Sequence, residues 1–185
     1  MKASKKKFLC AALILIACNN MAQANPEQNK TESASTATSK PEHTILTKAQ
    51  IENFFPKQLG DYVLFNIDVS LLKSKETASA TYIKNNDFNH TMVYTLEDGM
   101  RKKSATLKNF ESSYNTDLKG PESTEYIKME RDVYKTIAFL QPKINRNTIS
   151  FIYSNHFKLS LEGVEKPDVL WQYFRKEDLE KLNNY

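Results

Sequence analysis

Two of the three histidines lie where they could take part in proton transfer or metal binding. His90 and His156 each follow an asparagine, and Asp87 precedes His90 by three residues. An imidazole titrates near neutral pH and a carboxylate can orient it, so these residues could form an acid–base or metal site. Their spacing matches no metal-binding or metalloprotease motif. We therefore expect His90 and His156 to be turn or surface residues, and we predict no metal site.

Acidic side chains offer a second kind of chemistry, because two carboxylates on one strand face could serve a hydrolase. Glu130 and Asp132 are spaced by two residues, which places them on the same face of a strand. Lys128 precedes them on that face, and this pattern indicates a solvated strand edge. We expect no catalytic pair here.

The glycines leave no room for the loops that bind phosphates or dinucleotides. All four lie at boundaries between predicted elements: Gly60, Gly99, Gly120 and Gly163. We therefore predict no cofactor.

Aromatic residues are frequent, with ten Phe, nine Tyr and one Trp. In strands such residues are most often part of the core. If some of them line one open face of a sheet, they would instead form a binding surface for a protein or a ligand. The tyrosines to which this applies are Tyr82, Tyr94, Tyr126 and Tyr153.

The N-terminus has the features of an export signal. Residues 1–7 contain four lysines and no acid, and residues 8–17 are an unbroken apolar run. This run has the length of the apolar region of a signal peptide, whereas a membrane-spanning helix needs roughly 20 apolar residues. We assign residues 1–24 to the signal and exclude them from the fold.

Two processing sites overlap within this signal. The stretch LIAC at residues 15–18 resembles a bacterial lipobox, which implies cleavage after Ala17 and acylation of Cys18. Alternatively, the stretch AQA at residues 22–24 supplies the small residues that a signal peptidase recognises, with cleavage after Ala24. The first site gives a lipoprotein of the periplasm or outer membrane, and the second gives a released protein.

Residues 25–44 contain no aromatic residue and no aliphatic residue larger than alanine. Such a segment cannot offset its conformational entropy by burying apolar surface, so we predict a disordered linker. A lipid-anchored domain needs a spacer of this kind, which favours the lipoprotein interpretation.

The signal also accounts for the charge and the cysteines. Its four lysines equal the excess of 26 basic over 22 acidic residues, so the rest of the chain is formally neutral. A nucleic-acid-binding protein needs an excess of Lys and Arg, and we therefore expect no such partner. Cys10 and Cys18 are the only cysteines, so the folded domain has no disulfide and no thiolate site.

Residues 45–185 have the length of one domain. Apolar residues alternate with a period of two in several stretches and follow helical spacing in others. The strands we predict are residues 62–72, 78–83, 88–96, 126–133, 135–140, 147–153 and 157–162; the helices are residues 47–55, residues 100–114 and two short pieces after residue 167. This order indicates a single α+β domain with a mainly antiparallel sheet of about six or seven strands covered by two or three helices.

Three functions remain compatible with these observations. We expect a non-enzymatic bacterial envelope protein, a lipid-anchored module that binds a protein or an envelope component. One alternative is an envelope hydrolase with a dispersed site, which a polar pocket containing His90 or His156 with carboxylates would favour. The other is an inhibitor or immunity-type protein against an exported toxin or enzyme, which an apolar surface patch would favour.

Overall fold

The computed structural model describes residues 46–72, 75–99 and 105–185, with the backbone alone for residues 70–72 and 75–76. All of them belong to one compact unit, Lys40–Tyr185. The predicted signal, the linker and the acylation of Cys18 lie outside the described residues and stay predictions. None of the described helices is long and apolar enough to cross a membrane.

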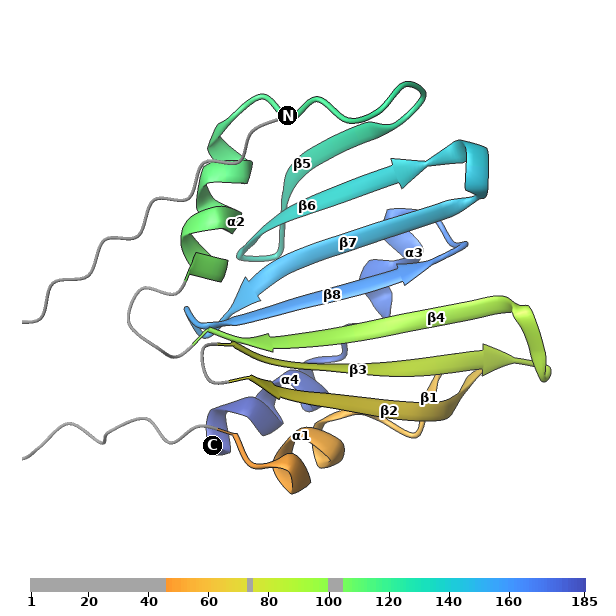
Figure 1. Cartoon of the computed structure of the whole chain (residues 1–185), viewed down its shortest axis with the longest axis vertical. Coiled ribbons are helices and arrows are strands. Elements are labelled where there is room, and N and C mark those ends of the chain that lie inside the picture. Colours follow the sequence, from red (N-terminus) through yellow and green to blue (C-terminus); the bar gives the residue numbers. More distant parts are fainter. Residues whose placement is uncertain (1–45, 73–74, 100–104) are drawn as a thin grey trace, which may run out of the picture. The chain divides into compact units, whose positions relative to one another are not determined.

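The described residues form one antiparallel sheet with helices on both faces (Figure 1). Its eight strands are β1 (Gln58–Leu59), β2 (Tyr62–Leu72), β3 (Lys75–Lys84), β4 (Asp87–Asp98), β5 (Glu125–Arg131), β6 (Tyr134–Gln141), β7 (Arg146–Tyr153) and β8 (Phe157–Gly163). The helices are α1 (Lys48–Phe54), α2 (Ala105–Asn115), α3 (Pro167–Gln172) and α4 (Lys176–Glu180), with two 3-10 turns, η1 (Pro142–Ile144) and η2 (Lys181–Asn184). The predicted α+β class is thereby confirmed.

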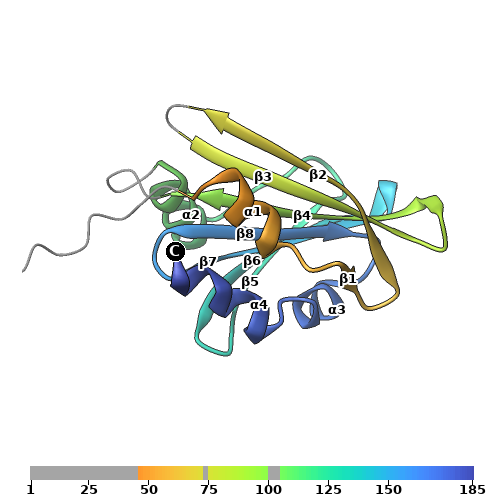
Figure 2. The ribbon, with the colours of Figure 1, turned by 90° about the horizontal axis from the view of Figure 1, so that it is seen from below.

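The strand order β1-β2-β3-β4-β8-β7-β6-β5 joins two meanders through the pair β4 and β8. In Figure 1, α3 and α4 lie behind the sheet, α1 lies below β2, and α2 lies in front of the sheet. Buried residues of α1, α3 and α4 belong to one core cluster. Figure 2 shows α3 and α4 together on one side of β7 and β8. We call the side of the sheet that α1, α3 and α4 cover the core face, and the opposite side the open face.

Cross-strand pairing builds the core from residues far apart in the sequence. Tyr94 on β4 faces Leu161 on β8, which in turn faces Ile149 on β7. All three side chains are at most 1% exposed. The helices complete the core face with Phe54 from α1 and Leu170 from α3. Alternation with a period of two therefore decides which side chains meet the helices.

Local sequence signals explain where the elements begin and end. Thr47 caps α1, because its hydroxyl accepts a hydrogen bond from the Gln50 amide while the Gln50 side chain accepts one from the Thr47 amide. Asn85 and Asn86 form the turn between β3 and β4, and both residues have positive φ, as a two-residue hairpin requires.

Strand β1 is an addition to the predicted elements. Its pairing with β2 depends on a tight turn at Gly60, whose φ is +55°. A Cβ atom at this position would lie 2.8 Å from Cε1 of Tyr173, so both the backbone and the close approach require glycine. For the helix predicted at residues 100–114, residues 100–104 are not described, and the described part is α2 (Ala105–Asn115).

Candidate functional site

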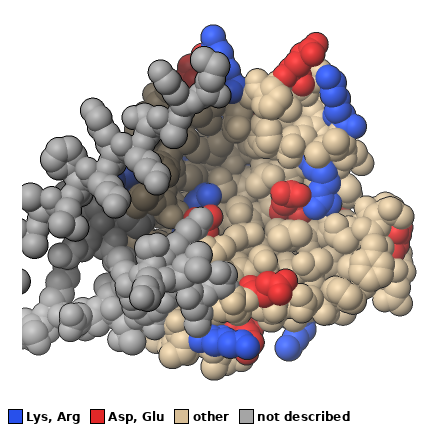
Figure 3. Space-filling view, viewed as in Figure 1, with Lys and Arg blue, Asp and Glu red and all other residues tan. Residues whose placement is uncertain are grey.

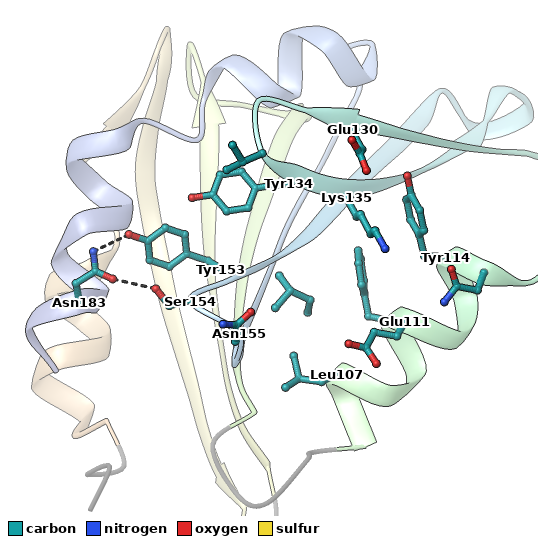
Figure 4. Close-up of a pocket in the computed structure, with 14 residues that line it drawn as sticks. Leu107, Glu111, Tyr114, Glu130, Tyr134, Lys135, Tyr153, Ser154, Asn155 and Asn183 are labelled. Atoms are coloured by element: carbon teal, nitrogen blue, oxygen red, sulfur yellow. Dashed lines mark hydrogen bonds between the residues drawn. The ribbon is translucent and has the colours of Figure 1, made fainter. Parts of the chain in front are cut away.

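A groove of about 580 Å³ separates α2 from the ends of β6 and β7 (Figure 4). The turn between β5 and β6 forms one side of it, and the turn between β7 and β8, together with η2, forms the other. The residues that line it are Leu107, Phe110, Glu111, Tyr114, Asn115, Glu130, Val133, Tyr134, Lys135, Ile152, Tyr153, Ser154, Asn155 and Asn183.

One wall of the groove is apolar, and helical spacing places it there. Leu107, Phe110 and Tyr114 follow each other at intervals of three and four residues, so they share one side of α2. Phe110 is the buried residue of this helix. Across the groove, Val133 is 87% exposed in the β5–β6 turn. The groove thus offers a ligand apolar surface from both sides.

Three charged side chains line the same groove. Glu111, Glu130 and Lys135 all line it, and Nζ of Lys135 lies 5.2 Å from the centre of the Tyr114 ring. Within the described part of the chain, none of the three charged groups forms an ion pair. Glu130 and Lys135 are cross-strand neighbours on β5 and β6, and a ligand that binds Lys135 would compete with the Tyr114 ring but would break no salt bridge.

Hydrogen bonds hold the opposite end of the groove. Asn183 of η2 donates to the hydroxyl of Tyr153 at 2.8 Å and accepts from Oγ of Ser154 at 2.9 Å, as the dashed lines of Figure 4 show. Burial, and then the neighbouring Tyr153 and Asp132, raise the pKa of Tyr134 above its ordinary value. Its phenol therefore stays protonated near neutral pH.

A second cavity of about 330 Å³ lies on the other side of Phe110, between α2 and the open face. Glu97 of β4 and Lys158 of β8 face each other on neighbouring strands in it, with 3.4 Å between Oε1 and Nζ. Thr106 of α2 donates to Glu97 at 3.4 Å. Figure 3 looks onto this open face and shows few charges over the strands. Helix α2 therefore rests on the sheet with cavities on both sides.

The two histidines of the sequence hypothesis lie far apart. His90 is near the start of β4, and His156 follows β7 at the opposite end of the sheet, where Asp98 pairs with Phe157. Nδ1 of His156 lies 2.7 Å from the carbonyl oxygen of Ser154, within its own turn. The structure therefore does not bring His90 and His156 into one site: His90 is an exposed residue of β4, and His156 lies in the turn between β7 and β8.

His90 does lie beside Asp87, with 2.7 Å between Nδ1 and Oδ2. A hydrogen bond from the amide of Asn89, followed by the contact with His90, lowers the pKa of Asp87. An ionised Asp87 favours the His90 tautomer that carries its proton on Nδ1 and leaves Nε2 free. The two residues line a polar pocket of about 270 Å³.

Two residues that sequence reasoning missed complete this polar pocket. The hydroxyl of Tyr62 donates a short hydrogen bond to Oε1 of Glu165. Burial, and then Glu165, raise the pKa of Tyr62. Oε2 of Glu165 is buried and has no hydrogen-bond partner among the residues described. The two residues are 103 positions apart, and no local pattern links them.

The four tyrosines do not form a shared binding surface, which corrects the expectation from the sequence. Tyr82 and Tyr94 are fully buried on the core face, and Tyr153 is 7% exposed there. Tyr126 lies on the open face, stacked on Phe139 at 4.5 Å. Three of the four became core residues because α1, α3 and α4 cover the face to which they point.

Among residues 46–72, 75–99 and 105–185, no group of three or more His, Cys, Asp or Glu side chains is placed to hold a metal ion.

No protein-family model matches the chain, and no curated protein matches it. A crystal structure of a GTP-binding regulator from Thermotoga maritima is similar, with a TM-score of 0.44 and 9% sequence identity over 71% of this chain and 86% of that chain. So weak a similarity says nothing about what this chain binds.

Proposed function

We propose that this chain is an exported bacterial envelope protein, lipid-anchored through Cys18, and that it binds a ligand in the groove beside α2 without catalysing a reaction. The observation that carries the binding role is the combination of an apolar wall with unpaired charged groups in one groove. Concave sites with apolar linings and a few polar groups are the usual form of a ligand site.

The lining favours a ligand of mixed character. An apolar part would cover the wall formed by Leu107, Phe110 and Tyr114, and polar groups would reach Glu111 on α2 and Lys135 on β6. Because Lys135 lies over the Tyr114 ring, a ligand that stacks on Tyr114 would also meet the ammonium group. The proposal therefore depends on Tyr114 more than on any other residue.

Nuclear magnetic resonance of the mature protein, titrated with a panel of amphipathic fragments, tests the groove. We expect fragments to shift amide signals of α2 and of the β5–β6 turn, and Tyr114→Ser to weaken binding about tenfold. Glu177→Gln, on the exposed surface of α4, is the matched control and should leave binding unchanged. If Tyr114→Ser does not change the amide shifts that the fragments cause, the groove is not the binding site.

The intact mass of the mature protein tests the anchor separately. Acylation of Cys18 adds a lipid mass to a chain that starts at residue 18, whereas a chain that starts at Asn25 has no anchor. Cys18→Ser should move the protein from the membrane fraction to the soluble fraction. A mass that corresponds to an unmodified chain beginning at Asn25 would show that the protein is released and not anchored. That result would not affect the proposal of a ligand site in the groove.

A second candidate function, hydrolysis in the polar pocket, is favoured by one observation. His90, Asp87, Glu165 and Tyr62 all line it, and Asp87 orients His90. An oriented imidazole with a free Nε2 can act as a general base toward water. A panel of ester, amide and glycoside substrates would reveal such an activity. If it exists, His90→Ala should reduce it at least a hundredfold.

A further inference from the structure

The two edges of the sheet differ in how well they are protected against an added strand. On β5, four of seven residues are charged, and Lys128 donates to the carbonyl of Thr116 while Arg131 pairs with Asp168 at 2.6 Å. Charged side chains and covering loops are the usual protection of an edge strand. The opposite edge has almost none of this protection.

That opposite edge is the outer side of β2. Strand β1 covers only its start, through the pairs Gln58 with Val63 and Leu59 with Tyr62 and one further hydrogen bond from the amide of Leu64 to the carbonyl of Lys57. Beyond Leu64, no other strand of the described chain pairs with this edge. Residues 62–72 contain no Lys, Arg, Glu or Pro. The remaining edge therefore presents unpaired backbone groups to an incoming strand.

Apolar side chains are displayed beside the open edge. Val63, Phe65 and Phe88 are 54%, 57% and 62% exposed, and the rings of Phe65 and Phe88 meet edge to face with 5.2 Å between their centres. The register of β2 with β3 shifts at Phe65, and that of β3 with β4 shifts next to Phe88. Irregularities of this kind turn side chains outward at sheet edges. We call these three residues the apolar corner.

The charge of the open edge narrows the choice of partner. Asp68 is its one charged residue, and it accepts a hydrogen bond from Asn66 at 2.9 Å. It has no ion-pair partner in the described chain. A basic residue opposite Asp68 on an added strand would form a favourable cross-strand pair.

A second copy of this chain fits the edge poorly. Antiparallel pairing of two β2 strands about the middle of the open stretch would bring the two Asp68 carboxylates opposite or diagonal to each other, which is unfavourable. The apolar corner offers about 300 Å² of exposed surface, less than the roughly 800 Å² per partner of a stable complex. Affinity must therefore come largely from main-chain hydrogen bonds.

We propose that the outer edge of β2 binds an extended segment of a partner protein as a ninth strand. The segment places an apolar side chain on the apolar corner and a Lys or Arg beside Asp68. Strand addition draws its affinity from backbone hydrogen bonds and its selectivity from side chains at alternate positions, and this edge supplies both. The surface is separate from the groove beside α2.

Two synthetic peptides test the proposal with the mature protein. Each is a capped eight-residue peptide in which valine and threonine alternate around one phenylalanine and one central charged residue, either lysine or glutamate. We expect the lysine peptide, at millimolar concentration, to slow amide hydrogen exchange in residues 65–69. The glutamate peptide should bind about threefold more weakly, and Asp68→Lys should reverse that preference.

Matched variants separate this surface from others. Phe65→Ser combined with Phe88→Ser should weaken binding of the lysine peptide at least fivefold, whereas Val133→Ser, at a still more exposed apolar residue of the β5–β6 turn, should not affect it. Tyr114→Ser, which tests the groove, should also leave this binding unchanged. The proposal is overturned if the peptide slows amide hydrogen exchange at β5, or if the slowing at β2 does not depend on the charge at position 68. It is also overturned if exchange at β2 slows with rising protein concentration in the absence of peptide.

Discussion

Two tyrosines on neighbouring strands differ in one interaction. Tyr82 and Tyr94 are both fully buried on the core face. The hydroxyl of Tyr82 donates to the carbonyl of Pro56 at 3.0 Å, whereas the hydroxyl of Tyr94 has no hydrogen-bond partner among the residues described. A buried hydroxyl without a partner carries a desolvation cost that no interaction offsets.

Replacing each of these tyrosines by phenylalanine should therefore have opposite effects. Tyr82→Phe leaves the Pro56 carbonyl without its partner and should lower the free energy of unfolding by about 1 kcal/mol. Tyr94→Phe removes only an unsatisfied group and should leave that free energy unchanged or raise it. Urea denaturation of both variants measures the difference, and an equal loss in the two would show that Tyr94 has a partner as well.

At the scale of elements, α2 is attached far less firmly than the strands. Phe110 is its buried residue, and cavities lie on both sides of that side chain. Most of the surface of α2 is polar. Segments with few buried apolar contacts open at a lower free energy than the rest of the fold.

Phe110→Ala should therefore release α2 while the sheet stays folded. We expect amide hydrogen exchange in residues 105–115 to accelerate at least tenfold, with little change in β4, β7 and β8. Leu159→Ala is the matched core variant, because Leu159 is fully buried between neighbouring strands, and it should cost about 2–5 kcal/mol of global stability. Global unfolding caused by Phe110→Ala would show that α2 belongs to the cooperative core.

The elements were more accessible to sequence reasoning than the sites. In the predicted strand 88–96, alternation with a period of two puts Met92, Tyr94 and Leu96 on one face, and all three are buried. Alternation does not reveal which face the helices cover, so it leaves Tyr94 equally compatible with an open surface. The pair Tyr62 and Glu165 depends on contact between segments that are distant in the sequence. The periodicity of apolar residues cannot predict such a contact.

At the scale of the whole molecule, three of the tyrosines whose pKa values are raised are fully buried on the core face. Burial is the main cause for Tyr62, Tyr82 and Tyr94. An unfolded tyrosine titrates near pH 10. Folding therefore favours the protonated phenol in each case, and the unfolded chain releases these protons at a lower pH than the folded chain does.

Below about pH 9 these three tyrosines should consequently cause no change in the free energy of unfolding. That free energy should fall as the pH rises through the unfolded pKa of tyrosine. Above that point the unfolded state binds fewer protons than the native state, so the free energy of unfolding decreases with pH. Each of the three tyrosines should contribute a loss of about 1 kcal/mol by pH 11. Tyr94→Phe provides the control. It should remove the contribution of one tyrosine to the loss at high pH while leaving the free energy of unfolding at pH 7 unchanged. Urea denaturation at pH 7, 9, 10 and 11 measures how the free energy of unfolding changes with pH in the wild type and in Tyr94→Phe. Parallel curves for the two proteins would mean that Tyr94 ionises as readily in the folded chain as in the unfolded one.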